Sequence, residues 1–432
     1  MGIEENERVC KYLNEIILKV RNKEAHEEIK LELISHIEEL YEGYVESGIE
    51  KDEAIRNAIA QMGNADIIGE KLDKVHRGSP EWGIVVATAL MSFIGIFTAV
   101  FIGISGEVTH YNKNSGRNMI ISVLIGITLA MALYKFDYRK LKKYSTHIFI
   151  GTNLLMVLSI LFSNYINGSK YITIMSISIN ITPIYLFLMC ICLPGILKNI
   201  KLKGSIGYLK LIGSYIIPIV LIAMIPDIFY TLIYTCVFIA VLINNKYSRR
   251  VISSLGITYI AAIVGIVLQA GTYARNRLLM FLTPHKDPEG LGYINYIFNK
   301  IIKGASPLGK GNGITINELP EANTDFVFAY IIHTFGWIVA IVISVLVTFF
   351  IVRLFKSSKL IKDDFGKSIV VSLSIIFSLQ FIENIFMTFN LVPVMSIGFP
   401  FISYGGTSMI INMVSIGLIM GIYKRKSYAY TI

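Results

Sequence analysis

The chain has 432 residues, of which 54% are hydrophobic and only 16% are charged. This composition is typical of membrane proteins and excludes an ordinary soluble enzyme. The formal net charge of +10 does not indicate nucleic-acid binding, because the Lys and Arg residues lie in short clusters between apolar runs. The four cysteines are too few and too dispersed for a disulfide framework.

Residues 1–78 differ in composition from the rest of the chain. They are polar and charged throughout, contain no signal peptide, and repeat apolar residues at spacings of three and four, as from Val9 to Val20. Gly48 and Gly63 lie where helices are expected to end. The pattern predicts a domain of roughly four short amphipathic helices, which we expect on the cytoplasmic side of the membrane.

From Trp82 onward, apolar runs of about twenty residues recur, and each is long enough to cross a hydrocarbon core about 30 Å thick. Residues 79–432 are therefore predicted to form an all-α, polytopic membrane domain with about ten transmembrane helices. The expected spans lie near 83–104, 118–135, 146–165, 177–197, 207–225, 228–245, 251–270, 326–352, 369–391 and 402–423.

The basic residues predict the orientation of these spans. Lys and Arg concentrate in cytoplasmic connections, so a cytoplasmic N-terminus requires every second connection to be basic. The basic connections lie at 135–143, 198–210, 246–250, 353–367 and 424–426, and the connections between them carry few cations. Both termini are therefore expected in the cytoplasm.

One outer connection, 271–325, is much longer than the others. Structureless connections rarely reach fifty residues, so this loop is expected to be functional. It ends on the stretch LPEANTDF, which places Glu321 and Asp325 directly before the next apolar run. From the residues alone two interpretations stay open: Asn323, Thr324 or Asp325 caps the helix that follows, or Asp325 is a functional acid at the membrane surface.

LPEANTDF and the later stretch PVMSIGFPFISYGGTS (393–408) resemble the FtsW/RodA/SpoVE proteins, the shape, elongation, division and sporulation (SEDS) family of cell-wall glycosyltransferases. The resemblance extends over about 83–425. Further matches are IPDIFYT with Asp227, GSKYI with Lys170 and Tyr171, the pair Arg275 and Arg277, and QFIENI with Gln380 and Asn384.

The resemblance implies a ten-helix membrane protein of the bacterial cytoplasmic membrane. Members polymerise lipid II, the undecaprenyl-diphosphate-linked peptidoglycan precursor, beside a class B penicillin-binding transpeptidase, for cell shape, division or sporulation. The sequence does not choose among those three roles. Membrane lipids are the other expected partners.

The resemblance makes Asp325 the catalytic acid, because it occupies that place in the PE-x-x-TDF motif. A carboxylate in a partly dry cavity is suited to act as general base on a sugar hydroxyl. Arg275 and Arg277 are expected to bind the diphosphate, with interfacial snorkelling as the alternative. Lys170 and Glu321 are further expected substrate contacts. The resemblance also implies a divalent cation, Mg or Mn, whose ligands the sequence does not identify.

Several positions depart from the family pattern: Asn323, His333, Thr334, Ile294, Tyr185 and Tyr171. These departures are the evidence for one alternative function, a catalytically inactive scaffold that holds a transpeptidase. A second alternative is a flippase for the lipid-linked precursor, since transporters place ionisable groups near the membrane midplane. Against it, the acid is predicted at the outer surface and no internal repeat is evident.

Overall fold

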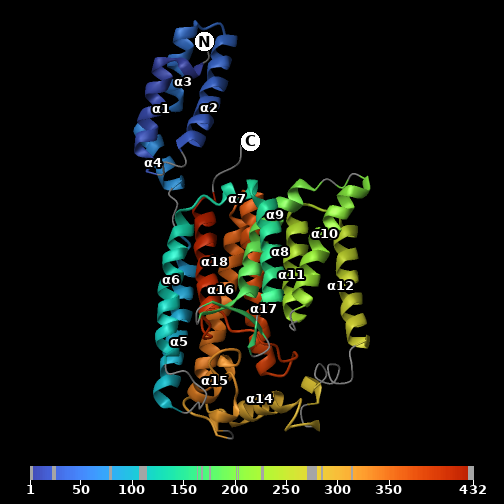
Figure 1. The fold of residues 1–432 in the computed structure, drawn as a ribbon. Helices are drawn as coiled ribbons and strands as arrows, with labels where there is room; N and C mark the ends of the chain where they lie inside the picture. Colours follow the sequence, from blue (N-terminus) through green and yellow to red (C-terminus); the bar gives the residue numbers. More distant parts are fainter. Residues whose placement is uncertain are drawn as a thin grey trace. The chain divides into compact units, whose positions relative to one another are not determined.

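The computed structural model contains two compact units. One is formed by Met1–Pro80, Leu360–Asp363 and Tyr423–Ile432, and the other by Glu81–Lys359 and Asp364–Ile422 (Figure 1). The residues that the structure describes are 3–21, 26–76, 80–106, 114–162, 164–166, 169–174, 177–200, 202, 204–224, 228–269, 280–283, 286–312 and 315–426.

The first unit contains the short predicted helices. They are α1 (Glu7–Lys19), α2 (His26–Glu46), α3 (Lys51–Met62) and α4 (Ala65–His76), with a 3-10 turn, η1 (Ile3–Glu5), before them. Gly48 and Gly63 follow α2 and α3 with φ of 84° and 99°, a left-handed conformation that favours glycine.

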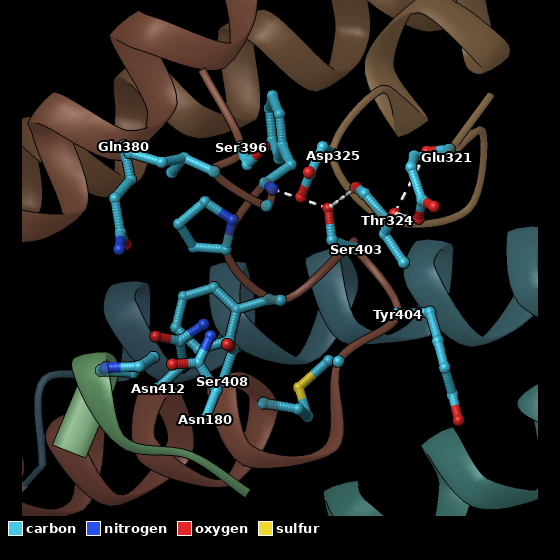
Figure 2. A pocket seen from close by; sticks show the side chains of 18 of the residues that line it. Asn180, Glu321, Thr324, Asp325, Gln380, Ser396, Ser403, Tyr404, Ser408 and Asn412 are labelled. Atoms are coloured by element: carbon cyan, nitrogen blue, oxygen red, sulfur yellow. Dashed lines mark hydrogen bonds between the residues drawn. The ribbon is translucent and has the colours of Figure 1, made fainter. Parts of the chain in front are cut away.

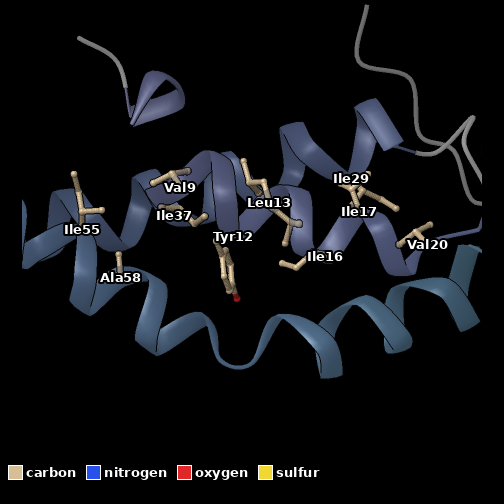
Figure 3. Close-up of a cluster of buried hydrophobic side chains, with 11 residues drawn as sticks. Val9, Tyr12, Leu13, Ile16, Ile17, Val20, Ile29, Ile37, Ile55 and Ala58 are labelled. Atoms are coloured by element: carbon tan, nitrogen blue, oxygen red, sulfur yellow. The ribbon is translucent and has the colours of Figure 1, made fainter. Parts of the chain in front are cut away.

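One apolar cluster forms the core of this unit (Figure 3). Helix α1 contributes the largest share of it, and in this helix Val9 and Ile16 are fully buried and Leu13 is nearly so. Ile37 of α2 and Ala58 of α3 pack against the same cluster. Each fully buried large aliphatic side chain contributes about 1.5–3 kcal/mol, so this cluster holds the unit together.

The second unit is a bundle of apolar helices. Its long helices are α5 (Trp82–Ser105), α6 (Ser115–Lys135), α8 (Ser145–Phe162), α9 (Ile181–Asn199), α10 (Gly204–Ala223), α11 (Ile228–Asn244), α12 (Arg249–Gln269), α16 (Trp337–Lys359), α17 (Asp364–Thr388) and α18 (Gly406–Lys424). Within the described ranges, eight of them are long and apolar enough to cross a membrane. Helices α11 and α12 lie where the two remaining spans were predicted. The chain is therefore a multi-pass membrane protein.

The predicted eighth span, 326–352, is not one helix. The structure divides it into α15 (Val327–Phe335) and α16, with Gly336 between them at φ 88°. The loop residues Ser306 and Pro307 accept hydrogen bonds from the backbone N–H groups of Trp337 and Ile338, both at 3.0 Å. The prediction was wrong because the sequence is strongly apolar on both sides of Gly336, whereas a distant loop segment satisfies the backbone at the break.

The predicted fourth span, 177–197, begins as a strand rather than as a helix. A small antiparallel sheet of order β1-β2-β3 is formed by β1 (Asn164–Ile166), β2 (Ser169–Ile174) and β3 (Ile177–Asn180). Its register places Tyr171 opposite Asn180. Asn180 then caps α9, because its side chain accepts a 3.0 Å hydrogen bond from the Thr182 N–H.

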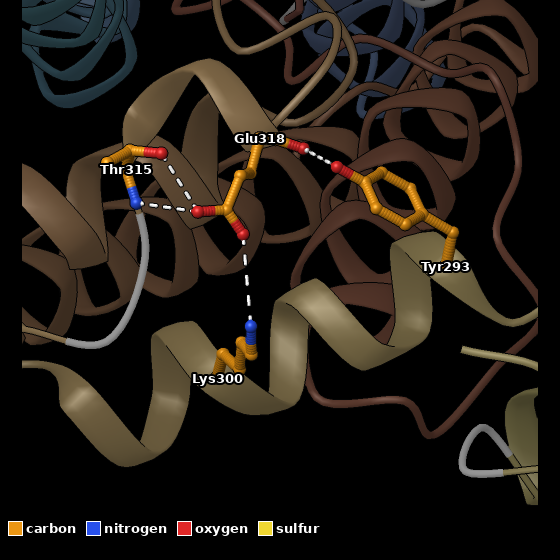
Figure 4. Close-up of polar contacts among 4 residues, drawn as sticks. All are labelled: Tyr293, Lys300, Thr315 and Glu318. Carbon is orange, nitrogen blue, oxygen red and sulfur yellow. Dashed lines mark hydrogen bonds and ion pairs between the residues drawn. The ribbon is translucent and has the colours of Figure 1, made fainter. Parts of the chain in front are cut away.

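The described part of the long loop is folded. It contains η3 (Met280–Leu282), the amphipathic helix α14 (Tyr293–Gly304) and η5 (Ile316–Glu318). Glu318 accepts hydrogen bonds from the backbone N–H and the hydroxyl of Thr315, and its carboxylate lies 3.9 Å from Lys300 of α14 (Figure 4). Tyr293 donates a 2.7 Å bond to the Glu318 carbonyl. These contacts fix the start of the LPEANTDF turn against α14.

The two ends of the membrane unit differ in charge. The short helix α7 (Arg139–Lys143), with the sequence RKLKK, lies at one end, whereas α14 and α15 lie at the other (Figure 1). Arg353, Lys356 and Lys359 occupy the end of α16 that is remote from α15. The loop that carries Asp325 therefore lies at the end of the unit opposite the basic one.

Candidate functional site

A cavity of about 180 Å³ lies beside the LPEANTDF turn. Five parts of the chain line it: the β2–β3 hairpin with the start of α9, α11 through Tyr230, the turn itself, α17 through Gln380, and 396–412, which includes the first turns of α18. Figure 2 shows the polar side chains that surround it. The two family-like stretches thus face the same space.

Glu321 organises the turn. It adopts φ 47°, which is strained for a residue with a side chain, and its carbonyl oxygen accepts the N–H groups of Thr324 and Phe326 at 3.1 Å each. Its carboxylate accepts a 2.6 Å hydrogen bond from the Thr324 hydroxyl. The side chain also lines the cavity, and its predicted role as a substrate contact stays a prediction.

Ser403 joins the turn to the second stretch (Figure 2). Its hydroxyl donates a 2.5 Å hydrogen bond to the carbonyl of Thr324 and accepts a 2.6 Å bond from the N–H of Phe399. The next residue, Tyr404, donates its N–H to the Asn323 carbonyl at 2.8 Å. The sequence analysis did not predict this hydroxyl bridge.

Asn384 fixes the same two segments from within the bundle. Its side chain is fully buried, and its Nδ2 donates to the carbonyl oxygens of Asp325 and Ile397 at 2.8 and 2.7 Å. One amide on α17 therefore holds the backbone on both sides of the cavity. Buried hydrogen bonds of this kind are costly to lose, because the freed carbonyls cannot reach water.

Asp325 is not the N-cap residue of the helix that follows it. Helix α15 begins at Val327, its N-cap residue is Phe326, and the Phe326 side chain makes no capping hydrogen bond. The prediction of an N-cap at Asn323, Thr324 or Asp325 is therefore wrong. Asp325 instead lines the cavity, beside Ser403 in Figure 2.

Tyr171 of β2 forms part of the facing wall. Burial, and then the nearby charge of Asp325, raise the pKa of its hydroxyl above the usual value of 10.0, while a hydrogen bond to Asn180 acts in the opposite direction. The phenol therefore stays protonated at neutral pH and is a hydrogen-bond donor close to the carboxylate. Tyr171 is one of the positions that the sequence analysis noted as a departure from the family pattern.

The structure does not describe the side chains of the predicted cationic ligands. Arg275 and Arg277 lie outside the described residues, as does Asp227, and for Lys170 the structure gives only its place in β2, paired with Tyr165. Of the described residues that line the cavity, none is Lys or Arg. Their binding roles stay predictions.

The structure adds amides and hydroxyls that the sequence analysis did not assign to the site. Gln380, Ser408 and Asn412 line the cavity from α17 and α18. Gln380 had been noted only as a family match. An amide in an apolar helix was the available signal, since such groups are rare in membrane spans and often functional.

Most departures from the family pattern lie away from the cavity. His333 is buried in α15, and neither it nor Thr334 lines the cavity. Tyr185 of α9 is buried and donates a 3.0 Å hydrogen bond to Asn153 of α8. Asn323 contributes its backbone carbonyl to the contact with Tyr404. Tyr171 is the departure that changes the lining itself.

The cavity suits a divalent cation only if the phosphates of a bound substrate supply further ligands. Within the described residues, no group of three or more His, Cys, Asp or Glu side chains could hold a metal ion by itself. Mg²⁺ is commonly held by one or two carboxylates together with substrate phosphates. Glu321 and Asp325 line the cavity and offer such carboxylates.

These observations define a multi-pass membrane protein with an acidic, amide-lined cavity at the end opposite its basic one. The chain belongs to the FtsW/RodA/SpoVE family, whose model, described as "cell cycle protein", matches residues 81–428.

Relatives of this family match most of the chain. The probable peptidoglycan glycosyltransferase FtsW of Nitrosomonas europaea is 23% identical over 79% of this chain and 93% of its own length. The peptidoglycan glycosyltransferase RodA of Treponema pallidum is 24% identical over 79% of this chain and 97% of its own length.

The fold is also found among solved structures. A chain from the structure titled "Structural coordination of polymerization and crosslinking by a peptidoglycan synthase complex" matches with a TM-score of 0.68 and 18% identity. The match covers 81% of this chain and 99% of that one.

Proposed function

We propose that the protein is a peptidoglycan glycosyltransferase that polymerises lipid II, with Asp325 as its catalytic base. The observation that carries the proposal is the placement of Asp325: its backbone is held by Asn384, and the adjoining Thr324 by Ser403, at the wall of a polar cavity. The relatives named peptidoglycan glycosyltransferases support it.

The reaction joins two sugars. The acceptor hydroxyl attacks the anomeric carbon of the donor, a new C–O bond forms, and the bond from that carbon to the diphosphate oxygen breaks. Asp325 takes the hydroxyl proton as the bond forms, and the diphosphate leaves with the bonding electron pair. Holding the turn rigidly favours this step, because positioning supplies much of the rate in such transfers.

The donor's diphosphate needs positive charge, since Glu321 and Asp325 make the described lining acidic. We include Lys170, Arg275 and Arg277 as ligands of the diphosphate. We also include a divalent cation, Mg²⁺ or Mn²⁺, held by Glu321 or Asp325 together with the phosphates. When bound, it would offset the charge of the leaving group.

The amides and hydroxyls that line the cavity suit a sugar. Asn180, Gln380 and Asn412 each offer both donors and acceptors, and Tyr171 offers a donor. Such groups orient hydroxyl-bearing and acetamido-bearing rings without adding charge. The proposed acceptor sugar therefore lies against this wall, with its reacting hydroxyl toward Asp325.

We further propose that both termini lie in the cytoplasm and that the cavity faces the outer side. The basic end marked by α7 and by Arg353, Lys356 and Lys359 supports this orientation, because cytoplasmic connections carry the excess of cations. A class B penicillin-binding transpeptidase is the proposed partner. The likeness to a chain of a peptidoglycan synthase complex supports a shared fold with such assemblies.

The test is polymerisation by the purified full-length protein. Given lipid II and Mg²⁺ in detergent, it is expected to produce glycan strands that resolve as a ladder after electrophoresis. In vesicles, the same preparation is expected to polymerise lipid II without moving it across the membrane. Translocation without polymer would overturn the proposal in favour of a flippase, and neither activity, with the transpeptidase present, would favour a scaffold.

A further inference from the structure

A second cavity, of about 230 Å³, lies at the basic end of the membrane unit. It forms where α9 and α11 end and α17 begins. Its lining residues are Leu197, Lys198, Ile200, Asn244, Asn245, Lys246, Tyr247 and Asp364. None of them belongs to the site described above, and the cavity lies at the opposite end of the helices.

Lys246 is held in a strained conformation at the end of α11. Its φ is 58°, in the left-handed region, and its N–H donates to the Ile243 carbonyl while that of Tyr247 donates to the Leu242 carbonyl, both at 3.0 Å. This helix ending favours glycine or asparagine at the left-handed position. A lysine that keeps such a conformation is a reason to look for a function.

Asn245 carries a buried amide donor with no partner. Its Nδ2 is inaccessible to solvent and makes no hydrogen bond to any residue that the structure describes. The preceding Asn244, by contrast, donates to the Asp364 carbonyl and to the Ser368 hydroxyl, at 3.0 and 2.5 Å. An unmet buried donor is unfavourable, and an acceptor-bearing ligand in the adjoining cavity would remove the penalty.

Two carbonyls at the end of α9 are already paired. The Tyr247 hydroxyl donates to the carbonyls of Leu197 and Ile200 at 2.7 and 3.3 Å. Lys198 and Lys246 form no salt bridge in the described part of the chain, and Asp364 is the single acid in the lining. The cavity thus presents two ammonium groups and an amide donor against one carboxylate.

We propose that this cavity binds one phosphate group, supplied by the headgroup of an anionic phospholipid. Lys198 and Lys246 hold the phosphate oxygens, the Nδ2 group of Asn245 donates to one of them, and Leu197 and Ile200 contact the glycerol. A lipid is the favoured source because the cavity lies at the ends of three membrane helices, and basic pockets between such helices suit lipid headgroups. The proposal is independent of the proposed function.

The test uses the full-length protein, purified in detergent and depleted of lipid. Its melting temperature and its lipid binding by native mass spectrometry are measured with phosphatidylglycerol, with phosphatidylcholine and with inorganic phosphate. Phosphatidylglycerol is expected to bind and to raise the melting temperature more than the other two. Removing the lysines singly, as Lys198→Gln and Lys246→Gln, should each weaken phosphatidylglycerol binding about fivefold.

Lys246→Gly separates lipid binding from a structural role. Glycine relieves the left-handed strain, so the lipid-free variant should melt at the same temperature as the wild type or higher, yet bind phosphatidylglycerol as weakly as Lys246→Gln does. The matched control is Lys356→Gln. Lys356 is exposed and lies in the last turn of α16, at the basic end of the membrane unit, so this variant should keep the response. An equal response of the wild type and the double variant K198Q/K246Q, or an equal loss in the control, would overturn the site. Equal stabilisation by inorganic phosphate would overturn the lipid as its source.

Discussion

The Nδ2 group of Asn384 donates a 2.8 Å hydrogen bond to the backbone carbonyl of Asp325, although the two residues are 59 positions apart in the chain. The same group reaches the Ile397 carbonyl at 2.7 Å. The acid's backbone is thereby fixed to the segment that forms the opposite side of its cavity. A catalytic base acts efficiently only when its position is maintained, so the proposed role of Asp325 depends on this hydrogen bond.

Asn384→Ala is expected to lower both stability and polymerisation. It removes the hydrogen bond to the buried Ile397 carbonyl, at a cost of about 1–3 kcal/mol, and frees the turn that holds Asp325. The control is Asn153→Ala, which removes the acceptor of the buried Tyr185 hydroxyl between α8 and α9, away from the cavity. Both variants should melt earlier, and rates per folded molecule should fall only for Asn384→Ala. Equal rates for the two would contradict the link.

Ser403→Ala should reduce turnover more than substrate binding. The hydroxyl bridges Thr324 and Phe399, and its loss removes two hydrogen bonds that position the turn, about 0.5–1.5 kcal/mol each. Ser374→Ala is the matched control, since that buried hydroxyl donates only to the Val370 carbonyl within α17. Steady-state kinetics with lipid II should show a lower kcat and a nearly unchanged KM. A normal kcat would show that the bridge does not position the acid.

Gly336→Ala should destabilise the membrane unit. At φ 88° and ψ 178° a side chain is strained, and a Cβ there would lie 2.8 Å from both the Leu308 Cα and the Ser306 carbonyl oxygen. The expected cost is at least about 1–3 kcal/mol. Gly151→Ala in α8, where a Cβ meets nothing within 4 Å, is the control. Thermal melting in detergent should separate the two; equal melting would mean that α15 and α16 join without strain.

Glu318 should make the loop sensitive to acid. Hydrogen bonds from Thr315 and then the charge of Lys300 lower the pKa of Glu318 from its usual 4.5. A lowered folded pKa contributes stability that is fully present above 4.5 and is lost as the pH falls through the folded value. In melting scans from about pH 6 to about pH 3.5, the difference between wild type and Glu318→Gln should therefore narrow toward the acid end. A constant difference across that range would show that the carboxylate has no folded partner.

Periodicity and loop length predicted the elements that depend on local pattern. The apolar repeat around Val9 and the twenty-residue runs after Trp82 correspond to observed helices, because burial in a core or in lipid imposes those patterns directly. The break at Gly336 was missed, since its cause lies in a loop 30 residues earlier, where Ser306 accepts the Trp337 N–H. The β2–β3 hairpin was missed for a related reason: an apolar strand resembles the start of a membrane helix.

The sequence predicted a catalytic role for Asp325, which stays a prediction, but it did not predict the contacts around this residue. The PE-x-x-TDF motif predicted a functional role for Asp325. The choice between a helix N-cap and a cavity-lining acid required the observed start of α15 at Val327. Asn384 was noted only as a match in a motif. A backbone carbonyl can accept a hydrogen bond whatever its residue type, so the sequence does not indicate which residue Asn384 contacts. Contacts of that kind are visible only once the chain has folded.

The most direct test of the account replaces the carboxylate of Asp325 while keeping its shape. Asp325→Asn, Glu321→Gln and the wild type would be purified in parallel and assayed for glycan polymerisation and for lipid II binding. We predict that Asp325→Asn binds lipid II and folds as the wild type does, but makes no polymer, whereas Glu321→Gln keeps measurable activity. Glycan strands made by Asp325→Asn at the wild-type rate would contradict the assignment of Asp325 as the base.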